Sequence, residues 1–115
     1  MKFMLLSHGN EQAMNNATAV DATGMSPEYA AYNEALVKAG AMVGGERLRP
    51  TSTAASVRVR NGKTEVLDGP YAETKEQFGG YYLIEAADMD AALDWAAKCP
   101  ASRQGTVEVR SVIQS

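Results

Sequence analysis

The chain has 115 residues, 45% of them apolar, and a formal net charge of −3. Such a length fits one domain, residues 1–115, with a core of its own. The acidic balance, without a basic stripe, argues against nucleic acid and a membrane surface as partners. One histidine and one cysteine leave no disulfide framework and no strong set of metal ligands, so we expect a cytoplasmic protein without metal or cofactor.

The amino-terminal run Phe-Met-Leu-Leu is apolar on both faces, which predicts a strand over residues 2–7 in the middle of a sheet. His8 follows at the carboxyl end of this strand, on the same face as Met4. It either caps the strand end or carries protons at the mouth of a cleft, because histidine titrates near neutrality without help. Residues 9–25 are small and polar and predict a long loop.

A helix is predicted over residues 26–39. Ser26 is a good cap for free amides, Pro27 suits the first helical position, and a glycine follows the last turn. Tyr29 and Tyr32 share the apolar face. Tyr29 either packs in the core with a solvated hydroxyl or donates a hydrogen bond into a cleft.

A second strand is predicted over residues 41–50, interrupted by Gly44-Gly45, which is typical of a bulge or a close backbone approach. Arg47 and Arg49 alternate with a leucine and therefore share a face. They either hold a carboxylate, which makes a small anionic molecule a candidate ligand, or lie on a solvated or dimer-facing edge.

Residues 55–60 and 63–68 alternate in polarity, and Asn61-Gly62 between them is the strongest short-range signal for a β-hairpin. The valines are predicted on one face and the arginines on the other. Arg58 and Arg60 are both candidates to pair with Glu65 across the hairpin.

The chemistry of the chain is concentrated between Asp68 and Gly80. Gly69-Pro70 is a turn signal that holds Asp68 at the end of a strand. A phenol, acids and a base follow within a few residues, namely Tyr71, Glu73, Lys75 and Glu76.

Residues 80–86 predict an interior strand, Asp88 caps a second helix, and residues 106–113 predict the last strand. The predicted buried stripe of the second helix is Met89, Ala92, Leu93 and Ala96. Trp95 lies off this stripe and predicts a second contact surface. The inward residues of the last strand are predicted to be Val107, Val109, Ser111 and Ile113.

This order of elements predicts an α+β fold with helices on one face of a mainly antiparallel sheet. The strands are too apolar for the other face to meet water. Because the chain has no third layer, a second copy is expected to cover that face in an isologous homodimer.

The motif Asp68-Gly-Pro-Tyr71, followed by Ala-Glu-Thr-Lys-Glu76 and Gly79-Gly80, resembles the DGPF-type members of the YCII-related proteins. The segment Gly44-Gly-Glu-Arg-Leu-Arg-Pro50, the opening Met-Lys-Phe-Met-Leu-Leu and the closing Val107-Glu-Val-Arg110 match as well. The resemblance implies a ferredoxin-like fold assembled as a dimeric α+β barrel. It also implies a bacterial protein, often encoded near a sigma factor of the extracytoplasmic-function type, in a family whose members mostly have no assigned activity.

Some YCII-related proteins are thought to use a histidine–aspartate pair as acid and base. The resemblance puts that histidine at Tyr29 here, and a phenol with a pKa near 10 is a poor base at neutral pH. His8 stands where DGPF-type relatives more often carry tyrosine.

Three interpretations follow from the residues. In the first, the protein is an isomerase-like or lyase-like enzyme for a small polar molecule, with Asp68 as base and His8 or Tyr29 as proton donor. Its substrate-binding residues would be Lys75, Arg47, Glu73 and Tyr71. In the second, the protein is a non-catalytic module that binds a small metabolite or a sigma factor. In the third, Asp68 only accepts backbone hydrogen bonds in a turn.

Overall fold

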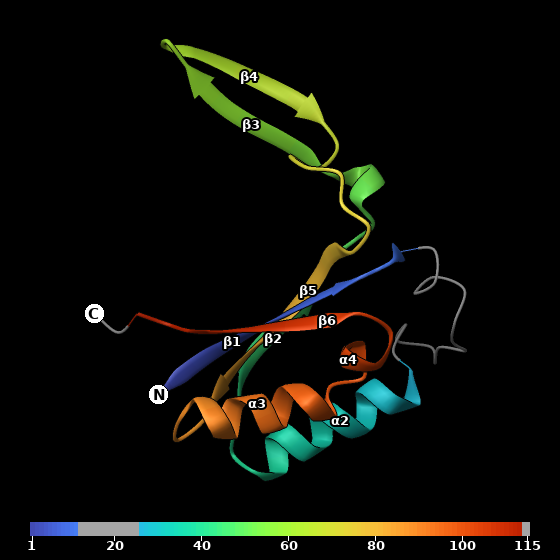
Figure 1. The fold of residues 1–115 in the computed structure, drawn as a ribbon, viewed down its shortest axis with the longest axis vertical. Helices are drawn as coiled ribbons and strands as arrows, with labels where there is room; N and C mark the ends of the chain where they lie inside the picture. The colour runs from blue at the N-terminus through green and yellow to red at the C-terminus, as the bar shows by residue number, and fades with distance from the viewer. Residues whose placement is uncertain (12–25, 114–115) are drawn as a thin grey trace.

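The computed structural model describes residues 1–11 and 26–113, in which a four-stranded antiparallel sheet carries helices on one face (Figure 1). The strand order is β2-β5-β1-β6. The strands of this sheet are β1 (Lys2–Gly9), β2 (Met42–Arg47), β5 (Gln77–Glu85) and β6 (Thr106–Ser111). The helices are α2 (Pro27–Lys38), α3 (Met89–Lys98) and the short α4 (Ala101–Gln104). The predicted α+β, ferredoxin-like arrangement is confirmed, while most of the loop predicted before the first helix lies outside the described residues.

Strand β1 is interior, as its two apolar faces predict. It pairs antiparallel with β5 on one side and with β6 on the other. Strand β5 in turn pairs with β2, with a register shift between Met42 and Gly44 where the glycine pair predicts an irregularity. The two continuously apolar runs therefore form the centre of the sheet.

Helices α2 and α3 begin at the caps that the sequence marks. The Ser26 hydroxyl accepts from the amide of Tyr29, and the Asp88 carboxylate accepts from the amide of Ala91 at 2.9 Å. After α2 the backbone of Gly40 has a φ of 70°, which favours glycine, and the chain turns into β2.

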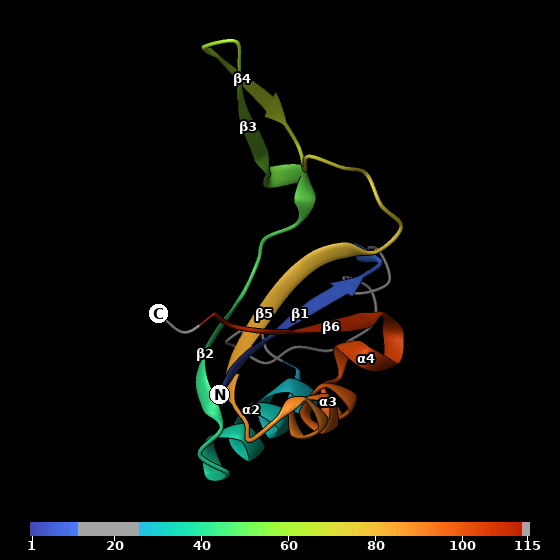
Figure 2. The same ribbon diagram turned by 60° about the vertical axis from the view of Figure 1, so that its left-hand side comes forward.

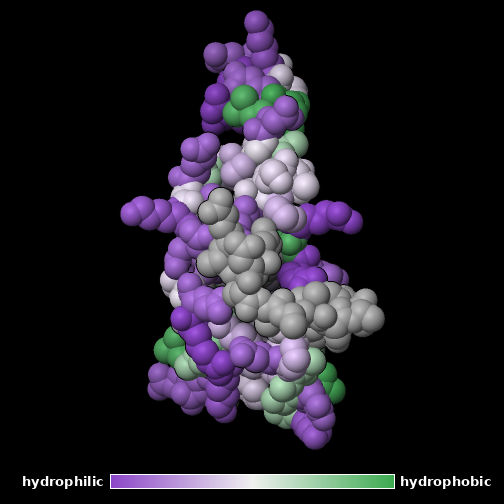
Figure 3. All heavy atoms as spheres, turned by 90° about the vertical axis from the view of Figure 1, so that its right-hand side faces the viewer, coloured by the Kyte–Doolittle hydropathy of each residue, from purple (hydrophilic) through white to green (hydrophobic). Residues whose placement is uncertain are grey.

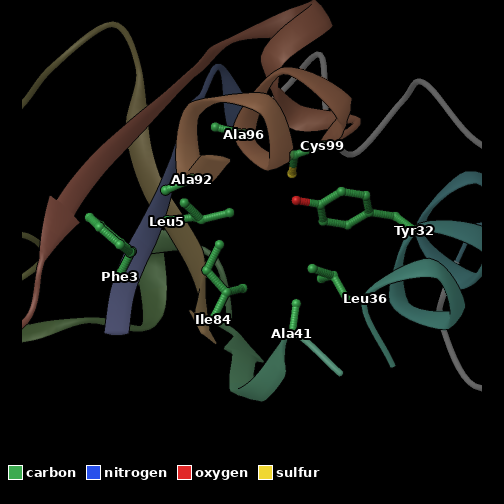
Figure 4. Packing of buried hydrophobic residues seen from close by; sticks show 9 residues of the cluster. All are labelled: Phe3, Leu5, Tyr32, Leu36, Ala41, Ile84, Ala92, Ala96 and Cys99. Atoms are coloured by element: carbon green, nitrogen blue, oxygen red, sulfur yellow. The ribbon is translucent and has the colours of Figure 1, made fainter. Parts of the chain in front are cut away.

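The core lies between the helices and the sheet (Figure 4). Its buried residues come from β1, β5, α2, α3 and the turns beside them: Phe3, Leu5, Tyr32, Leu36, Ala41, Ile84, Ala92, Ala96 and Cys99. The hydroxyl of Tyr32 donates to the carbonyl of Trp95 at 2.6 Å, so this buried phenol has the partner that it needs. Burial raises the pKa of the Cys99 thiol, which fits a packed side chain rather than a reactive one.

The predicted stripe of α3 is partly wrong. Met89 and Leu93 are exposed, whereas Trp95 packs against the core. Its ring lies edge-on to that of Tyr32, with the two ring centroids 6.2 Å apart. The buried face is centred on the small residues Ala92 and Ala96, which let α3 approach the sheet. Trp95 lies beside them on the flank that faces α2, so the helix layer and not the sheet receives the indole.

The predicted end of the last strand is also wrong. Val107 and Val109 are half-buried against the core, but Ser111 and Ile113 are exposed. The reason is that β6 ends at Ser111, whose partner is Phe3 near the start of β1, and the chain then runs past the sheet.

The predicted hairpin forms a separate two-stranded sheet of β3 (Ala55–Arg60) and β4 (Lys63–Asp68), here called the arm. Asn61 and Gly62 both have positive φ, at 52° and 75°, as a tight two-residue turn requires. Of the two arginines predicted to pair with Glu65, Arg58 does so, with its Nε 2.6 Å from Oε2, whereas Arg60 lies opposite Lys63. The arm projects away from the main sheet, beyond the short 3₁₀ helix η1 (Thr51–Thr53) (Figures 1 and 2).

The buried tyrosines predict a loss of stability at alkaline pH. Burial raises the pKa of Tyr29 to about 12 and also raises the pKa of Tyr32 and Tyr82. An unfolded chain releases these protons near pH 10. Above that pH the folded state holds more protons than the unfolded state, so the free energy of unfolding falls as pH rises toward 12.

Urea unfolding at pH 8, 10 and 11 measures this decline. Tyr82→Phe should make the decline shallower, whereas Tyr71→Phe should leave it unchanged, because Tyr71 is 93% exposed. A free energy of unfolding that stays constant from pH 8 to 11 contradicts the prediction.

Candidate functional site

The face of the sheet opposite the helices, here called the open face, has no layer over it in the described chain. Phe3 and Leu5 of β1 point into the core, so the intervening residues point to the open face. Strand register adds residues from β5 and β6. The open face thus carries Met4, Leu6, His8, Phe78, Tyr81, Leu83, Glu108 and Arg110, and a shallow hollow of about 370 Å³ lies between Met4, Leu6, Arg110 and residues 111–113.

His8 lies at the end of this face beside a carboxylate and an aromatic ring. Its Nε2 is 3.5 Å from Oε1 of Glu108, and its ring centroid is 5.5 Å from that of Phe78. The atom Nε2 is shielded from solvent and has no hydrogen-bond partner among the described residues. The side chains of His8 and Glu108 are 28% and 51% exposed, so the pair lies at the surface although Nε2 itself is covered.

A second carboxylate is held close to this pair. The hydroxyl of Thr106 donates to Oε1 of Glu76 at 2.8 Å, and Thr106 is the register partner of His8. The bond fixes the end of the Asp68–Gly80 motif to the start of β6. One imidazole and two carboxylates therefore lie at the same end of the sheet.

The backbone under His8 is fixed by a close approach. A Cβ at Gly105 would lie 2.0 Å from the carbonyl oxygen of His8, and therefore only glycine fits between α4 and β6. The turn before β6 therefore lies directly against the backbone of His8 and Gly9 at the end of β1, and this contact fixes the position of the His8 backbone.

The motif around Asp68 forms the root of the arm. The amide of Gly69 donates to the carbonyl of Ala54 at 2.7 Å, and the Ser56 hydroxyl donates to the carbonyl of Gly69 at 2.8 Å. Asp68 itself ends β4 and is exposed. The Asp68 carboxylate therefore lies at a strand end, as predicted, but this strand belongs to the arm and not to the main sheet.

The root is also tied to the end of β1. The Glu11 carboxylate accepts from the amide and the hydroxyl of Thr51, at 2.7 and 2.8 Å. Because Glu11 follows Gly9 by two residues, the arm starts from the end of the sheet that carries His8.

The structure separates the predicted site residues into two groups. Asp68, Tyr71, Glu73 and Lys75 are exposed along the connection from the arm to β5, at the His8 end of the molecule. Tyr29 and Arg47 lie on the helix-covered side of the sheet, where the charge of Arg47 opposes the rise in the Tyr29 pKa. His8 and Tyr29 therefore stand on opposite faces and do not meet.

Sequence reasoning missed Glu108 and Thr106 as neighbours of His8. The alternation of β6 signals that Glu108 points away from the buried valines. The pairing of β6 with β1 is a long-range property, however, and no local pattern announces it.

Replacing Gly105 tests the backbone constraint. We expect Gly105→Ala to lower the free energy of unfolding by about 1–3 kcal/mol, because the added methyl must push β1 and the α4–β6 turn apart. Gly44→Ala is the matched control, since a Cβ there meets nothing within 4 Å. Urea denaturation of both variants makes the comparison, and equal stabilities for the two contradict the close approach.

Within residues 1–11 and 26–113, no group of three or more histidine, cysteine or acidic side chains could hold a metal ion. Of the helices in the same ranges, none has the length and apolar character needed to cross a bilayer.

Comparison with known proteins gives two matches. The family described as YCII-related domain has a model that matches residues 1–115. An uncharacterised protein of Rhizobium meliloti (strain 1021) is 38% identical over 96 residues, which are 84% of this chain and 77% of that protein. Both matches agree with the resemblance carried by the Asp68–Gly80 motif.

Proposed function

This chain belongs to the YCII-related family, and from that premise we propose that its open face is an acid–base site for a small polar organic molecule. The observation that supports the proposal is the His8 pair: a partly exposed imidazole whose shielded Nε2 has no hydrogen bond within the described chain and faces the Glu108 carboxylate at 3.5 Å. An imidazole so placed is free to exchange a proton with a bound molecule.

The neighbours of His8 define its role. Glu108 compensates the positive charge that the imidazole acquires when it accepts a proton, and it limits how the ring turns. The ring of Phe78 lies beside that of His8, with the two ring centroids 5.5 Å apart. In this proposal His8 takes a proton from a carbon or hydroxyl of the substrate and returns it to another atom, as an isomerase or lyase does.

The charged connection from the arm supplies the rim of the site. The proposal assigns Asp68, Tyr71, Glu73 and Lys75 to this rim, and all four are exposed. A lysine on this rim suits a substrate with a carboxylate, in line with a small anionic ligand. Tyr29 and Arg47 are outside the proposal, because the sheet separates them from His8.

Proton exchange in D₂O tests the catalytic role across a range of candidate substrates. A panel of small 2-oxo acids, 2-hydroxy acids and lactones is followed by ¹H NMR for exchange at carbons next to the carbonyl. We expect His8→Gln to slow the exchange by about 10²–10⁴-fold, the usual contribution of a positioned acid–base group. Glu108→Gln should slow it less, because the carboxylate acts through the ring.

Glu34→Gln is the control, since Glu34 is an exposed carboxylate on α2 that pairs with Lys38. It should exchange at the wild-type rate. A His8→Gln protein that matches the wild type, or a panel without any exchange, contradicts the acid–base proposal.

Asp68 needs a test of its own. If its carboxylate handles a proton or holds the substrate, Asp68→Asn lowers the same exchange rate by at least about tenfold. If Asp68 only ends a turn, the rate stays at the wild-type value while the free energy of unfolding falls. Rate and stability measured on one preparation distinguish the two roles.

A second candidate function is a non-catalytic module that binds a small metabolite. It is favoured by the missing hydrogen bond between His8 and Glu108, because such a pair can hold a ligand as readily as it moves a proton. Thermal shift with the same panel separates the functions, since ligand binding without exchange supports the module. The sigma factor as a partner stays a prediction of the resemblance.

A further inference from the structure

The two ends of the open face differ in charge. Arg110 and Lys2 lie at the end where β1 starts, and both project from the open face. Glu85, the register partner of Lys2, lies 3.5 Å from the amino group of Met1 and so already has a cationic partner. The acid–base pair stands at the end where β1 finishes. An elongated molecule with one anionic end is therefore oriented along β1, with that end toward Arg110.

Arg110 makes no ion pair within residues 1–11 and 26–113. Its neighbour on the same face is Glu108, two positions earlier in β6, but the Glu108 carboxylate faces His8 instead. Arg110 is exposed, and an arginine holds a carboxylate through two parallel N–H bonds. The guanidinium is therefore available to an anionic ligand.

The hollow beside Arg110 is mostly apolar. Met4 and Leu6, both half-buried, line it from β1, and Val112 lines it from the segment after β6. The amide of Val112 donates to the carbonyl of Lys2 at 2.9 Å, which holds this wall against the sheet. The volume of about 370 Å³ falls within the range of roughly 300–1,000 Å³ that small-molecule sites occupy. The hollow therefore suits the apolar part of a ligand whose anionic end meets Arg110.

The strand register sets the distance between Arg110 and the acid–base pair. Arg110 lies opposite Met4, and Glu108 lies opposite Leu6, one step along the same face. One such step is two residues, or about 7 Å at a rise of ~3.4 Å per residue. His8 lies one step further, so a molecule that reaches both the pair and Arg110 needs about 7 Å or more between its carboxylate and its reacting carbon. Several carbons must lie between these two groups, unlike in a 2-oxo acid.

The valine face of the arm does not offer the same combination. Val57, Val59 and Val66 are exposed on this face, and an apolar patch is visible on the arm at the top of Figure 3. The arginines of the arm alternate with the valines and project from the other face, where Arg58 is paired with Glu65. The valine face therefore has no arginine beside it to hold an anionic group, whereas the open face has one.

We propose that the open face takes an oxo acid in which an apolar chain of several carbons separates the carboxylate from the reacting carbonyl. Arg110 binds the carboxylate, Met4 and Leu6 pack against the chain, and the carbonyl lies beside His8. The inference rests on the acid–base function proposed above and adds the class of molecule on which that function acts. In this arrangement Lys75, on the connection to β5, does not hold the carboxylate.

Calorimetric titration with methyl-ketone acids tests the class of ligand. The probes are pyruvate and acids with two, four or six methylene groups between the carbonyl and the carboxylate. We expect the acids with four and six methylene groups to bind at least about tenfold more tightly than pyruvate, because pyruvate is too short to fill the hollow and reach Arg110 together. Met4→Ser should reduce this preference, because it removes apolar surface from the hollow.

Arg110→Gln tests the carboxylate contact. It should raise the dissociation constant of the four-methylene acid at least about tenfold and that of its methyl ester less than about twofold, because the ester has no charge. Arg110→Lys keeps the cation and should restore part of the affinity. Arg103→Gln is the matched control, since Arg103 is an exposed arginine of α4 that pairs with Glu28, and it should bind the acid as the wild type does.

His8→Gln separates this inference from the acid–base function. It should leave the dissociation constant of the four-methylene acid within about twofold of the wild type while slowing the exchange in D₂O. A wild-type chain that binds the longer acids through Arg110 but exchanges no proton contradicts the acid–base function and supports the ligand assignment. A His8-dependent exchange that is equally fast for pyruvate and for the longer acids overturns the ligand assignment and supports the acid–base function.

Three further outcomes overturn the inference. One is the absence of saturable binding for every acid of the series. Another is an Arg110→Gln protein that binds the four-methylene acid as tightly as the Arg103→Gln protein. The third is a loss of affinity in Lys75→Gln in place of Arg110→Gln, since the carboxylate would then lie on the rim.

Discussion

The alternation of β1 is the constraint on which the rest of the structure depends. Phe3 and Leu5 are buried under the helices, so Leu6 and His8 must stand on the other side of the sheet. Both neighbours of β1 are fixed to it by antiparallel ladders, and the ladder to β5 shifts register between Ser7 and His8. The hydrophobic core therefore orients the imidazole although it never touches it, and the residues that stabilise the fold also aim the candidate site.

Local signals in the sequence predicted local structure well. The caps at Ser26 and Asp88 and the turn at Asn61-Gly62 each involve only a few neighbouring residues, and all three are present. The faces of α3 and the end of β6 were predicted incorrectly, because both depend on what packs against them. The periodicity of the α3 sequence could not reveal that Trp95 contacts α2. The alternation of the β6 sequence could not reveal that the chain leaves the sheet after Ser111.

In the candidate site, too, contacts between residues close in the sequence were predicted, and contacts between residues distant in the sequence were not. The Asp68–Gly80 motif was found because its residues are adjacent in sequence, and the family match covers it. The neighbourhood of His8 was not found, because Glu108 lies one hundred residues away and reaches it only through the β1–β6 register. The sequence offered Tyr29 and His8 as alternative proton donors, yet the sheet stands between them, because the helix residue Tyr29 and the open-face residue His8 lie on opposite sides of it.

The carboxylate of Glu11 joins two parts of the molecule that otherwise have little in common. Its two oxygens accept hydrogen bonds from the amide and the hydroxyl of Thr51, at the point where the chain leaves the sheet for the arm. Glu11 lies only three positions along the chain from His8, so this joint is close to the candidate site. The same two hydrogen bonds therefore fix the start of the arm and the end of β1 relative to each other.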